Sequence, residues 1–203
     1  MNEFDIKAKD WDKNQMHIER AEAIALAMLN TISIEEQMTA IEYGAGTGLL
    51  SFNLKDRFSK IILMDSSREM VRMAQQKIAD EHIKNMSALC IDLENEEFSG
   101  SCDMIYNQMV FHHVENIDLI LQKIRALLNP GGYLVIADLY AEDGSFHGEA
   151  FTGPKGFDVA NLSGLLKSKG FKDISHQECY RIKKTIEDGK IKEFPVFLMI
   201  GKV

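Results

Sequence analysis

Three glycines and a carboxylate in the first third of the chain have the types and spacing that nucleotide binding requires. Gly44, Gly46 and Gly48 stand between an apolar run and an amphipathic run, which is the setting of a cofactor-binding turn between a strand and a helix. Asp65 ends the next apolar run, about twenty residues further on, where a carboxylate can accept hydrogen bonds from both ribose hydroxyls. These residues predict a site for a cofactor that contains a nucleoside.

Two further acidic residues stand beside apolar runs. Glu42 lies within the run before the glycines, and a carboxylate in a buried strand needs a partner such as an ammonium group. Asp92 ends the third run, where its carboxylate can accept from an adenine amino group while Leu93 packs on the ring. Structural alternatives exist, since Asp92 can be an ordinary loop residue and Asp65 can cap the helix that follows. Together the acids favour a bound nucleoside.

Two adjacent histidines, His112 and His113, follow the fourth apolar run and are the first candidates for a catalytic base. Imidazole titrates near neutral pH and can take a proton from a hydroxyl or ammonium acceptor. The alternative is structural, with one histidine capping the next helix and the other packing against a loop. No metal is expected, because adjacent side chains should point apart and no carboxylate stands at ligand spacing.

Residues 140–156 form a glycine-rich stretch with little periodicity between two regular elements. A loop of this length in a compact domain is often functional. We therefore interpret it as an active-site loop that borders the substrate, with His147 as a surface residue. The aromatic residues that can shape a pocket there are Tyr140, Phe146 and Phe151.

The elements that position these residues alternate between strands and helices. Apolar runs predict strands over residues 39–43, 60–64, 86–91, 102–107 and 132–138. Amphipathic spacing predicts helices over residues 14–32, 48–58, 67–81, 116–128 and 157–169. Asn129-Pro130-Gly131-Gly132 predicts a break, and residues 172–183 and 194–203 predict two strands joined by a hairpin at Asp188-Gly189. The pattern is typical of a doubly wound α/β sheet covered by helices.

The overall composition restricts the function. A chain of 203 residues with 45% apolar residues can close one core, and a net charge of −8 disfavours a nucleic-acid partner. No apolar stretch approaches the roughly 20 residues that span a bilayer, and the first residues do not resemble a signal peptide. Cys90, Cys102 and Cys179 are expected to be buried, reduced thiols, which favours a cytoplasmic protein without a membrane partner.

The glycine-rich turn, the acids after it, the run 102–107 and the stretch 128–134 resemble successive motifs of class I S-adenosylmethionine-dependent methyltransferases. The resemblance extends from residue 39 to residue 138. It implies a Rossmann-like, three-layer αβα fold with six parallel strands and one antiparallel strand, preceded by an N-terminal helix. It also implies S-adenosyl-L-methionine as the cofactor and S-adenosyl-L-homocysteine as its product.

The resemblance also implies roles for the matching residues. Glu42 would hold the amino group of the cofactor directly or through water. The ribose would bind Asp65 beside Ser66, and the adenine would bind Asp92 and Leu93. The methionine portion would lie against residues of the first and fourth motifs: Gly44, Ala45, Gly46, and Asn107 or Gln108.

The N-terminal segment 8–12 resembles the segment with which small-molecule methyltransferases cover the cofactor. Trp11 in this segment either contacts the cofactor or docks the N-terminus onto the core. We expect a single domain with an N-terminal helical lid over residues 1–38 and a cofactor-binding core over residues 39–138. An acceptor-side loop and hairpin follow over residues 139–203.

The expected function is methyl transfer by direct displacement to a small-molecule acceptor, in a monomer or homodimer. Two alternatives stay open. A non-catalytic protein that binds S-adenosylmethionine or S-adenosylhomocysteine would keep the fold without acceptor chemistry. An NAD(P)-dependent oxidoreductase would share the glycine turn, but its usual third glycine would fall at position 49, which is Leu49.

Overall fold

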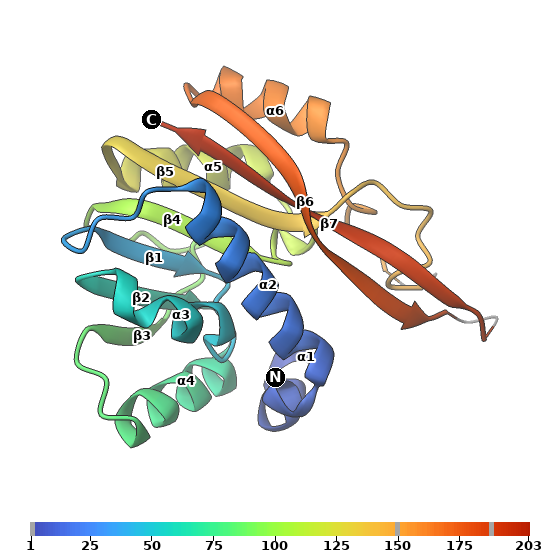
Figure 1. The fold of residues 1–203 in the computed structure, drawn as a ribbon, viewed down its shortest axis with the longest axis horizontal. Coiled ribbons are helices and arrows are strands. Elements are labelled where there is room, and N and C mark those ends of the chain that lie inside the picture. The colour runs from blue at the N-terminus through green and yellow to red at the C-terminus, as the bar shows by residue number, and fades with distance from the viewer. Residues whose placement is uncertain (1–2, 149–150, 187–188) are drawn as a thin grey trace.

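The computed structural model describes residues 3–148, 151–186 and 189–203. In this part of the chain one sheet has the strand order β3-β2-β1-β4-β5-β7-β6 (Figure 1). β7 is antiparallel to both of its neighbours, whereas β1 to β5 pair in parallel. The predicted fold class is therefore confirmed. The strands are β1 (Thr39–Tyr43), β2 (Lys60–Asp65), β3 (Met86–Cys90), β4 (Cys102–Gln108), β5 (Leu128–Leu139), β6 (Lys172–Thr185) and β7 (Ile191–Lys202).

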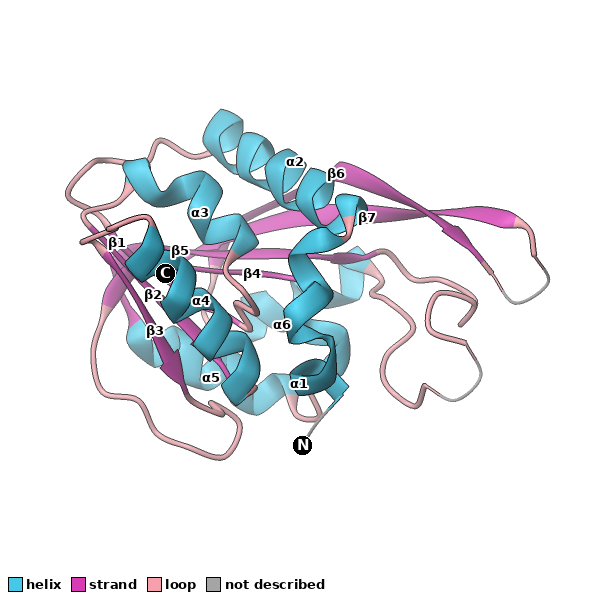
Figure 2. Ribbon diagram, turned by 90° about the horizontal axis from the view of Figure 1, so that it is seen from below, coloured by secondary structure: helices cyan, strands magenta, loops and turns pink. Residues whose placement is uncertain are grey.

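Helices cover both faces of the sheet (Figure 2). α2 (Gln15–Thr31), α3 (Leu49–Leu54) and α4 (Arg68–Asp80) contribute to the apolar cluster on one face. α5 (Ile117–Leu127) and α6 (Val159–Ser168) contribute to the cluster on the other face. The predicted three layers are confirmed, with the helix predicted over residues 14–32 as α2.

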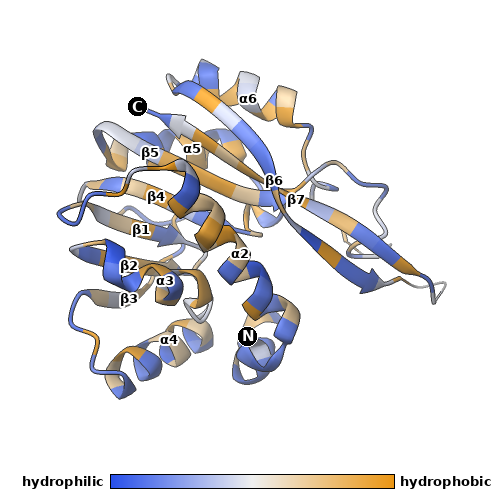
Figure 3. Cartoon of the chain, viewed as in Figure 1, coloured by the Kyte–Doolittle hydropathy of each residue, from blue (hydrophilic) through white to orange (hydrophobic). Residues whose placement is uncertain are grey.

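The core follows from the alternation of side chains along the strands. In β4, Met104 and Tyr106 belong to the first cluster and Ile105 to the second, because successive residues of a strand point to opposite faces. All three are almost completely buried, and the central strands are mostly orange in the hydropathy view of Figure 3. A sheet covered on both faces therefore leaves its strand ends as the place for polar chemistry.

Two predicted boundaries are wrong. The helix predicted over residues 48–58 ends as α3 at Leu54 and continues as the short 3₁₀ helix η2 (Lys55–Arg57). The signal at residues 129–132 follows the end of α5 at Leu127 as predicted, but the strand predicted to begin at residue 132 begins at Leu128. Leu128 already pairs with Cys102 before the register shifts, and Tyr133 pairs with Met104. The four residues between them form an irregularity in the strand rather than a turn before it.

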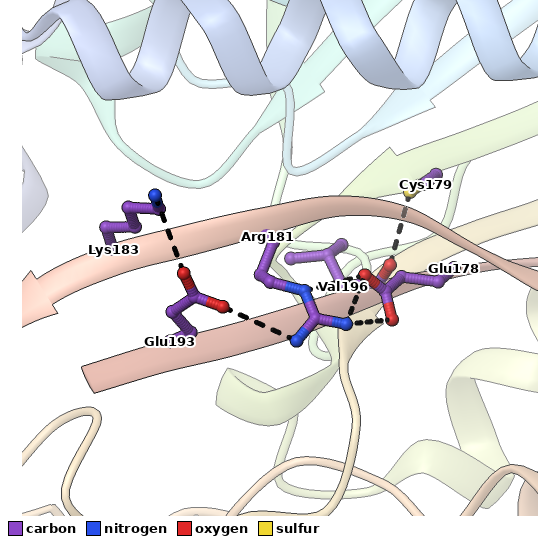
Figure 4. Close-up of polar contacts among 6 residues, drawn as sticks. All are labelled: Glu178, Cys179, Arg181, Lys183, Glu193 and Val196. Carbon is purple, nitrogen blue, oxygen red and sulfur yellow. Dashed lines mark hydrogen bonds and ion pairs between the residues drawn. The ribbon is translucent and has the colours of Figure 1, made fainter.

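The C-terminal strands form the predicted antiparallel pair, whose far end extends beyond the rest of the sheet (Figures 1 and 2). Across this pair Arg181 binds Glu178 on its own strand and Glu193 on β7, which Lys183 also contacts (Figure 4). These pairs are exposed, so each contributes at most about 1 kcal/mol. Asp188 of the predicted hairpin signal lies outside the described residues.

The cysteines differ from the prediction in one respect. Cys102 is buried and Cys179 is half-buried, but Cys90 at the end of β3 is exposed. β3 is an edge strand of the sheet, so its last residue has no neighbouring strand on one side to cover it. Among the described residues, no helix is both long and apolar enough to cross a membrane.

Candidate functional site

A cavity of about 1280 Å³ lies at the carboxyl ends of the parallel strands, beneath the N-terminal segment. In doubly wound sheets ligands bind at this edge, at the point where the strand order reverses, which is between β1 and β4 here. The volume exceeds the roughly 300 to 1,000 Å³ of common ligand pockets, so a nucleoside cofactor and a second ligand can share it. All of the predicted site residues except Glu42 and Asn107 line this cavity.

The glycine-rich turn leads from β1 into α3 and brings backbone to the cavity. Gly44 has φ +67°, and a Cβ at this position would lie 2.5 Å from a methyl group of Val110. Gly46 has φ +56° and lines the cavity beside Ala45. Gly48 has φ +85° at the N-terminus of α3, where a Cβ would collide with Leu63 of β2. The first two glycines therefore serve the cavity, and the third serves packing of the turn.

Asp65 ends β2 with both carboxylate oxygens held by backbone groups. Oδ2 accepts from the N–H of Gly46 at 2.7 Å, and Oδ1 accepts from the N–H of Ser67 at 2.8 Å. Burial raises the pKa of Asp65, and the two backbone hydrogen bonds oppose that rise. Each oxygen can accept a further hydrogen bond, so the carboxylate keeps capacity for two hydroxyl donors. Asp65 does not cap α4, because the capping side chain is Ser67, which accepts from Met70 N.

The segment after β3 also lines the cavity. Leu93 is buried, and both Asp92 and Leu93 line the cavity together with Ser66. Asp92 also organises its own turn, since its carboxylate accepts from Glu94 N at 3.1 Å and Asn95 Nδ2 at 2.8 Å. Asp92 therefore stabilises its own loop and also lines the cavity.

Glu42 is fully buried and does not line the cavity. Its Oε2 accepts from the backbone N–H of Ser51 at 3.1 Å and from the Ser51 hydroxyl at 2.5 Å, and that hydroxyl lies 2.7 Å from Tyr106 Oη. Oε1 has no hydrogen-bond partner among the described residues. Burial raises the pKa of Glu42 to about 8. The direct contact with a ligand's amino group has no support, and the indirect contact through water stays a prediction.

The two candidates at the end of β4 separate clearly. Gln108 lines the cavity, and its Oε1 is buried without a hydrogen-bond partner among the described residues. Asn107 is fully buried and does not line the cavity, and neither of its amide atoms has a partner in the described part of the chain. Successive strand residues point to opposite faces, which explains why only one of them reaches the cavity.

The N-terminal segment lies over the cavity as α1 (Glu3–Lys7) and the 3₁₀ helix η1 (Ala8–Lys13). Trp11 lines the cavity and packs on His17, with ring centroids 4.2 Å apart. Phe4 contacts both Trp11, at 6.1 Å, and His113, at 5.4 Å between ring centroids. The ion pair between Asp12 and Lys77, at 2.7 Å, joins this segment to α4. Both predicted roles of Trp11 agree with this position.

Three histidines converge at the other end of the cavity. His112 and His113 belong to the 3₁₀ helix η3 (Phe111–His113), and their ring centroids are 4.2 Å apart. His147 comes from the loop after β5, with its ring 5.0 Å from His112 and stacked on Phe151 at 4.1 Å. The expectation that the adjacent histidines point apart is therefore wrong, because a tight 3₁₀ turn holds both rings at the cavity. His147 is half-buried there rather than on the surface.

His112 is fixed by a buried carboxylate. Its Nδ1 lies 2.6 Å from Asp138 Oδ1, and its backbone N–H contacts Asp138 Oδ2 at 3.3 Å. A carboxylate only accepts hydrogen bonds, so Nδ1 of His112 is the donor and its Nε2 is free for another contact. Neither histidine caps the following helix, since the side chain at the start of α5 that accepts from Leu119 N is Asn116. The predicted helix cap is therefore wrong, whereas the predicted packing against a loop is confirmed, since His113 contacts Phe151 with ring centroids 5.4 Å apart.

Sequence reasoning missed two residues of this site. Asp138 is a fully buried carboxylate at the end of an apolar strand, which is the signal that singled out Glu42. Arg20 is a buried arginine of α2 that lines the cavity. Within the described residues its guanidinium makes one hydrogen bond, from Nη1 to Met16 Sδ at 3.5 Å, and its Nε has no partner. A charged residue on the apolar face of a predicted helix could have indicated it.

Of the loop aromatics, Phe146 and Phe151 line the cavity, whereas Tyr140 does not and packs on Phe197 with ring centroids 5.4 Å apart. The loop after β5 therefore lines the histidine end of the cavity, although only part of its aromatic set takes part. Lys184 of β6 also reaches this end, where its Nζ binds the backbone oxygen of Phe146.

Comparisons with known proteins agree with this geometry. A family model described as "Methyltransferase domain" matches residues 34–170. An uncharacterized methyltransferase of Schizosaccharomyces pombe is 29% identical over 131 residues, which are 61% of this chain and 46% of that protein. A malonyl-[acyl-carrier protein] O-methyltransferase of Ilyobacter polytropus is 27% identical over 55% of this chain and 43% of its own length. The chain thus matches less than half the length of these curated relatives.

A solved structure has the same fold. It is phosphoethanolamine N-methyltransferase 2 of Haemonchus contortus in complex with S-adenosyl-L-methionine, with a TM-score of 0.70 and 14% sequence identity. The alignment covers 100% of this chain and 60% of that protein.

Proposed function

Because this chain belongs to the S-adenosylmethionine-dependent class I methyltransferases, we propose that it moves the methyl group of that cofactor by direct displacement to a small-molecule acceptor. The observation that carries the proposal is the shared cavity, which has the carboxylate of Asp65 at one end and three histidines at the other. Alignment of a nucleophile with an activated methyl group can supply roughly 7 to 11 kcal/mol of barrier reduction. The membership in this family decides against the oxidoreductase alternative.

The residues of the glycine end fit this cofactor. Asp65 has capacity for two hydroxyl donors and is proposed to bind the ribose, beside Ser66. Gln108 presents a buried oxygen without a partner among the described residues, which suits the ammonium group of the cofactor. Asp92 and Leu93 are proposed to bind the adenine. The cofactor supplies a methyl group on a sulfonium, and these residues hold and orient it beneath Trp11.

Arg20 is proposed to bind an anionic group in the same cavity. A buried guanidinium without a carboxylate partner in the described chain is costly unless a ligand supplies the negative charge. Burial lowers the pKa of Arg20 to about 10, so the group remains charged at neutral pH. The carboxylate of the cofactor's methionine portion supplies such a charge, and an acidic acceptor would supply the same chemistry.

His112 and His113 are proposed to face the nucleophilic atom of the acceptor. Burial, together with the neighbouring His112, lowers the pKa of His113 to about 4, so His113 is neutral at neutral pH. A neutral imidazole can accept the proton of a hydroxyl or ammonium group as the nucleophile attacks. The acceptor is proposed to be a small molecule, as in the phosphoethanolamine enzyme with the same fold.

The proposed organisation follows the course of the chain. Residues 1–38 would act as the lid, residues 39–138 as the cofactor-binding core, and residues 139–203 as the acceptor-side loop and hairpin. The contacts of Phe4 with both Trp11 and His113 support a lid that spans the two ends of the cavity. Assembly as a monomer or a homodimer is proposed, and sedimentation of the full chain measures it.

Calorimetry tests the cofactor site. Wild type is expected to bind S-adenosylhomocysteine and not NAD, and Asp65→Ala is expected to weaken S-adenosylhomocysteine at least tenfold, because hydrogen bonds to a carboxylate are worth about 1.5–3 kcal/mol. The matched control is Asp56→Ala, which removes an exposed aspartate of η2. Binding of NAD alone, or an Asp65→Ala variant with unchanged affinity, would refute the proposed site.

A screen of small acceptors with labelled cofactor tests the reaction itself. Methylation of at least one small molecule is expected, with formation of S-adenosylhomocysteine in equal amount. Cofactor binding without transfer to any member of a broad panel would instead favour the non-catalytic alternative.

A further inference from the structure

The histidine end of the cavity has the form of a metal site. One ligand atom from each of His112, His113 and His147 lies within 4.8 Å of the other two. The rings come from two separate segments, η3 after β4 and the loop after β5, so tertiary folding brings them together. In a tetrahedral zinc site, Zn–N bonds of about 2.0–2.1 Å place ligand nitrogens roughly 3.4 Å apart. Binding of an ion would therefore require the nitrogens to approach one another by up to about 1.4 Å.

Each of the three histidines has a ring nitrogen that makes no hydrogen bond within the described residues. Asp138 takes the Nδ1–H of His112 at 2.6 Å, which leaves Nε2 of His112 as the available ligand. His147 Nε2 is buried and has no hydrogen-bond partner among the described residues. No ring nitrogen of His113 takes part in a hydrogen bond within the described chain. Buried polar atoms are normally satisfied, so the unpartnered Nε2 of His147, beside free ring nitrogens of His112 and His113, indicates a ligand between the three rings.

The contact between His112 and Asp138 has the arrangement found behind metal-bound histidines. A ligating imidazole usually donates its other N–H to a carboxylate, which fixes the ring and its tautomer. Asp138 is itself held, because it accepts from the backbone N–H of Leu139 at 2.7 Å and contacts that of His112. Both side chains are almost completely buried, with relative exposures of 1% for His112 and 0% for Asp138. This buried pair pre-orients one ligand before any ion arrives.

The chemical character of the three side chains selects the class of ion. Imidazole suits Zn²⁺, Cu²⁺, Ni²⁺ and Fe²⁺, whereas Mg²⁺ and Ca²⁺ prefer oxygen ligands. The neutral imidazole is the form that binds these metals. Three protein nitrogens leave one tetrahedral position open, as in catalytic zinc sites.

We propose that His112, His113 and His147 bind one divalent transition-metal ion, for which Zn²⁺ is the probe, with Asp138 positioning His112. With the ion bound, its open position would face the cavity and bind the nucleophilic group of the acceptor. His112 and His113 then hold the ion, and this role replaces the proton-accepting role that is proposed above for the metal-free imidazoles. The binding of the acceptor rests on the proposed methyl transfer, whereas the metal site itself does not. A hydroxyl or thiol acceptor is the chemical class that such an ion would bind.

Zinc titration of metal-free, tag-free protein by calorimetry tests the site. Wild type is expected to bind one Zn²⁺ per chain, with at least tenfold weaker binding in His113→Ala and in His147→Ala. Asp138→Asn keeps all three imidazoles and is expected to weaken zinc by about 10- to 100-fold, the range for such positioning partners. The matched control is His17→Gln, which alters a histidine that lines the cavity outside the cluster.

Two further measurements keep the result interpretable. S-adenosylhomocysteine binding and thermal unfolding show that each variant is folded, and X-ray absorption of the zinc-loaded wild type is expected to show imidazole scattering. Absence of stoichiometric zinc in wild type, or equal zinc binding by the histidine variants and wild type, would overturn the metal site. Zinc binding in a protein that fails to bind S-adenosylhomocysteine would instead overturn the proposed function and leave the metal site standing.

Discussion

The end of the cavity around Asp65 and the end around His112 are built in different ways. At the first end, residues at or just after the ends of β1, β2 and β3 supply backbone N–H groups and carboxylates. Asp65 is held by Ser67, two residues later, and by Gly46, in the turn that follows the neighbouring strand β1. At the second end, the histidines come from two segments separated by α5 and β5, and the carboxylate that fixes His112 stands 26 residues later. Motifs at neighbouring strand ends therefore build the end around Asp65, where the cofactor that donates the methyl group is proposed to bind. Packing of more distant segments builds the end around His112, where the acceptor is proposed to bind.

The largest expected effect separates the two ends by function. His113→Ala is expected to lower turnover of an acceptor from the screen by roughly 100-fold or more, the lower range for loss of a proton-transfer group or its equivalent. S-adenosylhomocysteine affinity should stay within about threefold, since no cofactor group is proposed at this residue. Activity assays and calorimetry measure the two effects. His176→Ala, on the exposed face of β6, is the control. Equal losses of binding and turnover would remove the distinction between the ends.

The second effect tests whether the glycine end depends on its backbone. Gly44→Ala is expected to weaken S-adenosylhomocysteine more than tenfold and to lower stability by about 1–3 kcal/mol, because of a φ of +67° and the contact with Val110. Gly164→Ala on α6 is the matched control, since nothing lies within 4 Å of its added Cβ. That variant should gain about 0.5–1 kcal/mol as a helical glycine replaced by alanine. Calorimetry and denaturant unfolding provide both numbers.

Substitution of Arg20 tests whether this residue binds the carboxylate of the cofactor or an anionic group of the acceptor. Arg20→Met is expected to weaken S-adenosylhomocysteine about tenfold, as for loss of a charge-assisted hydrogen bond. Methylthioadenosine, which lacks the amino acid portion, should bind wild type and variant equally. If both ligands keep their affinity, the anionic group belongs to the acceptor, and Arg20 is part of the histidine end.

The last prediction concerns stability rather than ligand binding, at Glu42 beneath the glycine turn. Its pKa is about 8 in the folded protein and 4.5 in the reference state, so between these values the folded protein holds a proton that the unfolded chain has released. Wild-type stability should therefore fall as the pH rises from 4.5 to 8, by about 1.4 kcal/mol for each unit of pKa difference that is realised. Glu42→Gln should flatten this dependence in urea unfolding curves. Exposed Glu36→Gln is the control, and parallel curves for Glu42→Gln and wild type would contradict the buried, protonated carboxyl.

Much of the donor end was predictable because its signals are local. The spacing from Gly44 to Asp65 reflects one strand, one turn and one helix, and a parallel sheet then places both strand ends at the same edge. The same logic located Asp92 and Leu93. It could not separate Gln108 from Asn107, because which face of β4 points to the cavity depends on the register of that strand in the sheet.

The sequence by itself determined the order of strands and helices, the sheet type and the glycine turn, because hydrophobic periodicity and turn residues act over short distances. Tertiary structure alone decided that Glu42 binds Ser51 rather than facing the cavity, and that Arg20 faces it. It also decided that His147 joins His112 and Asp138. The physical reason is that burial and partners of a polar side chain depend on elements that meet only after the sheet has closed.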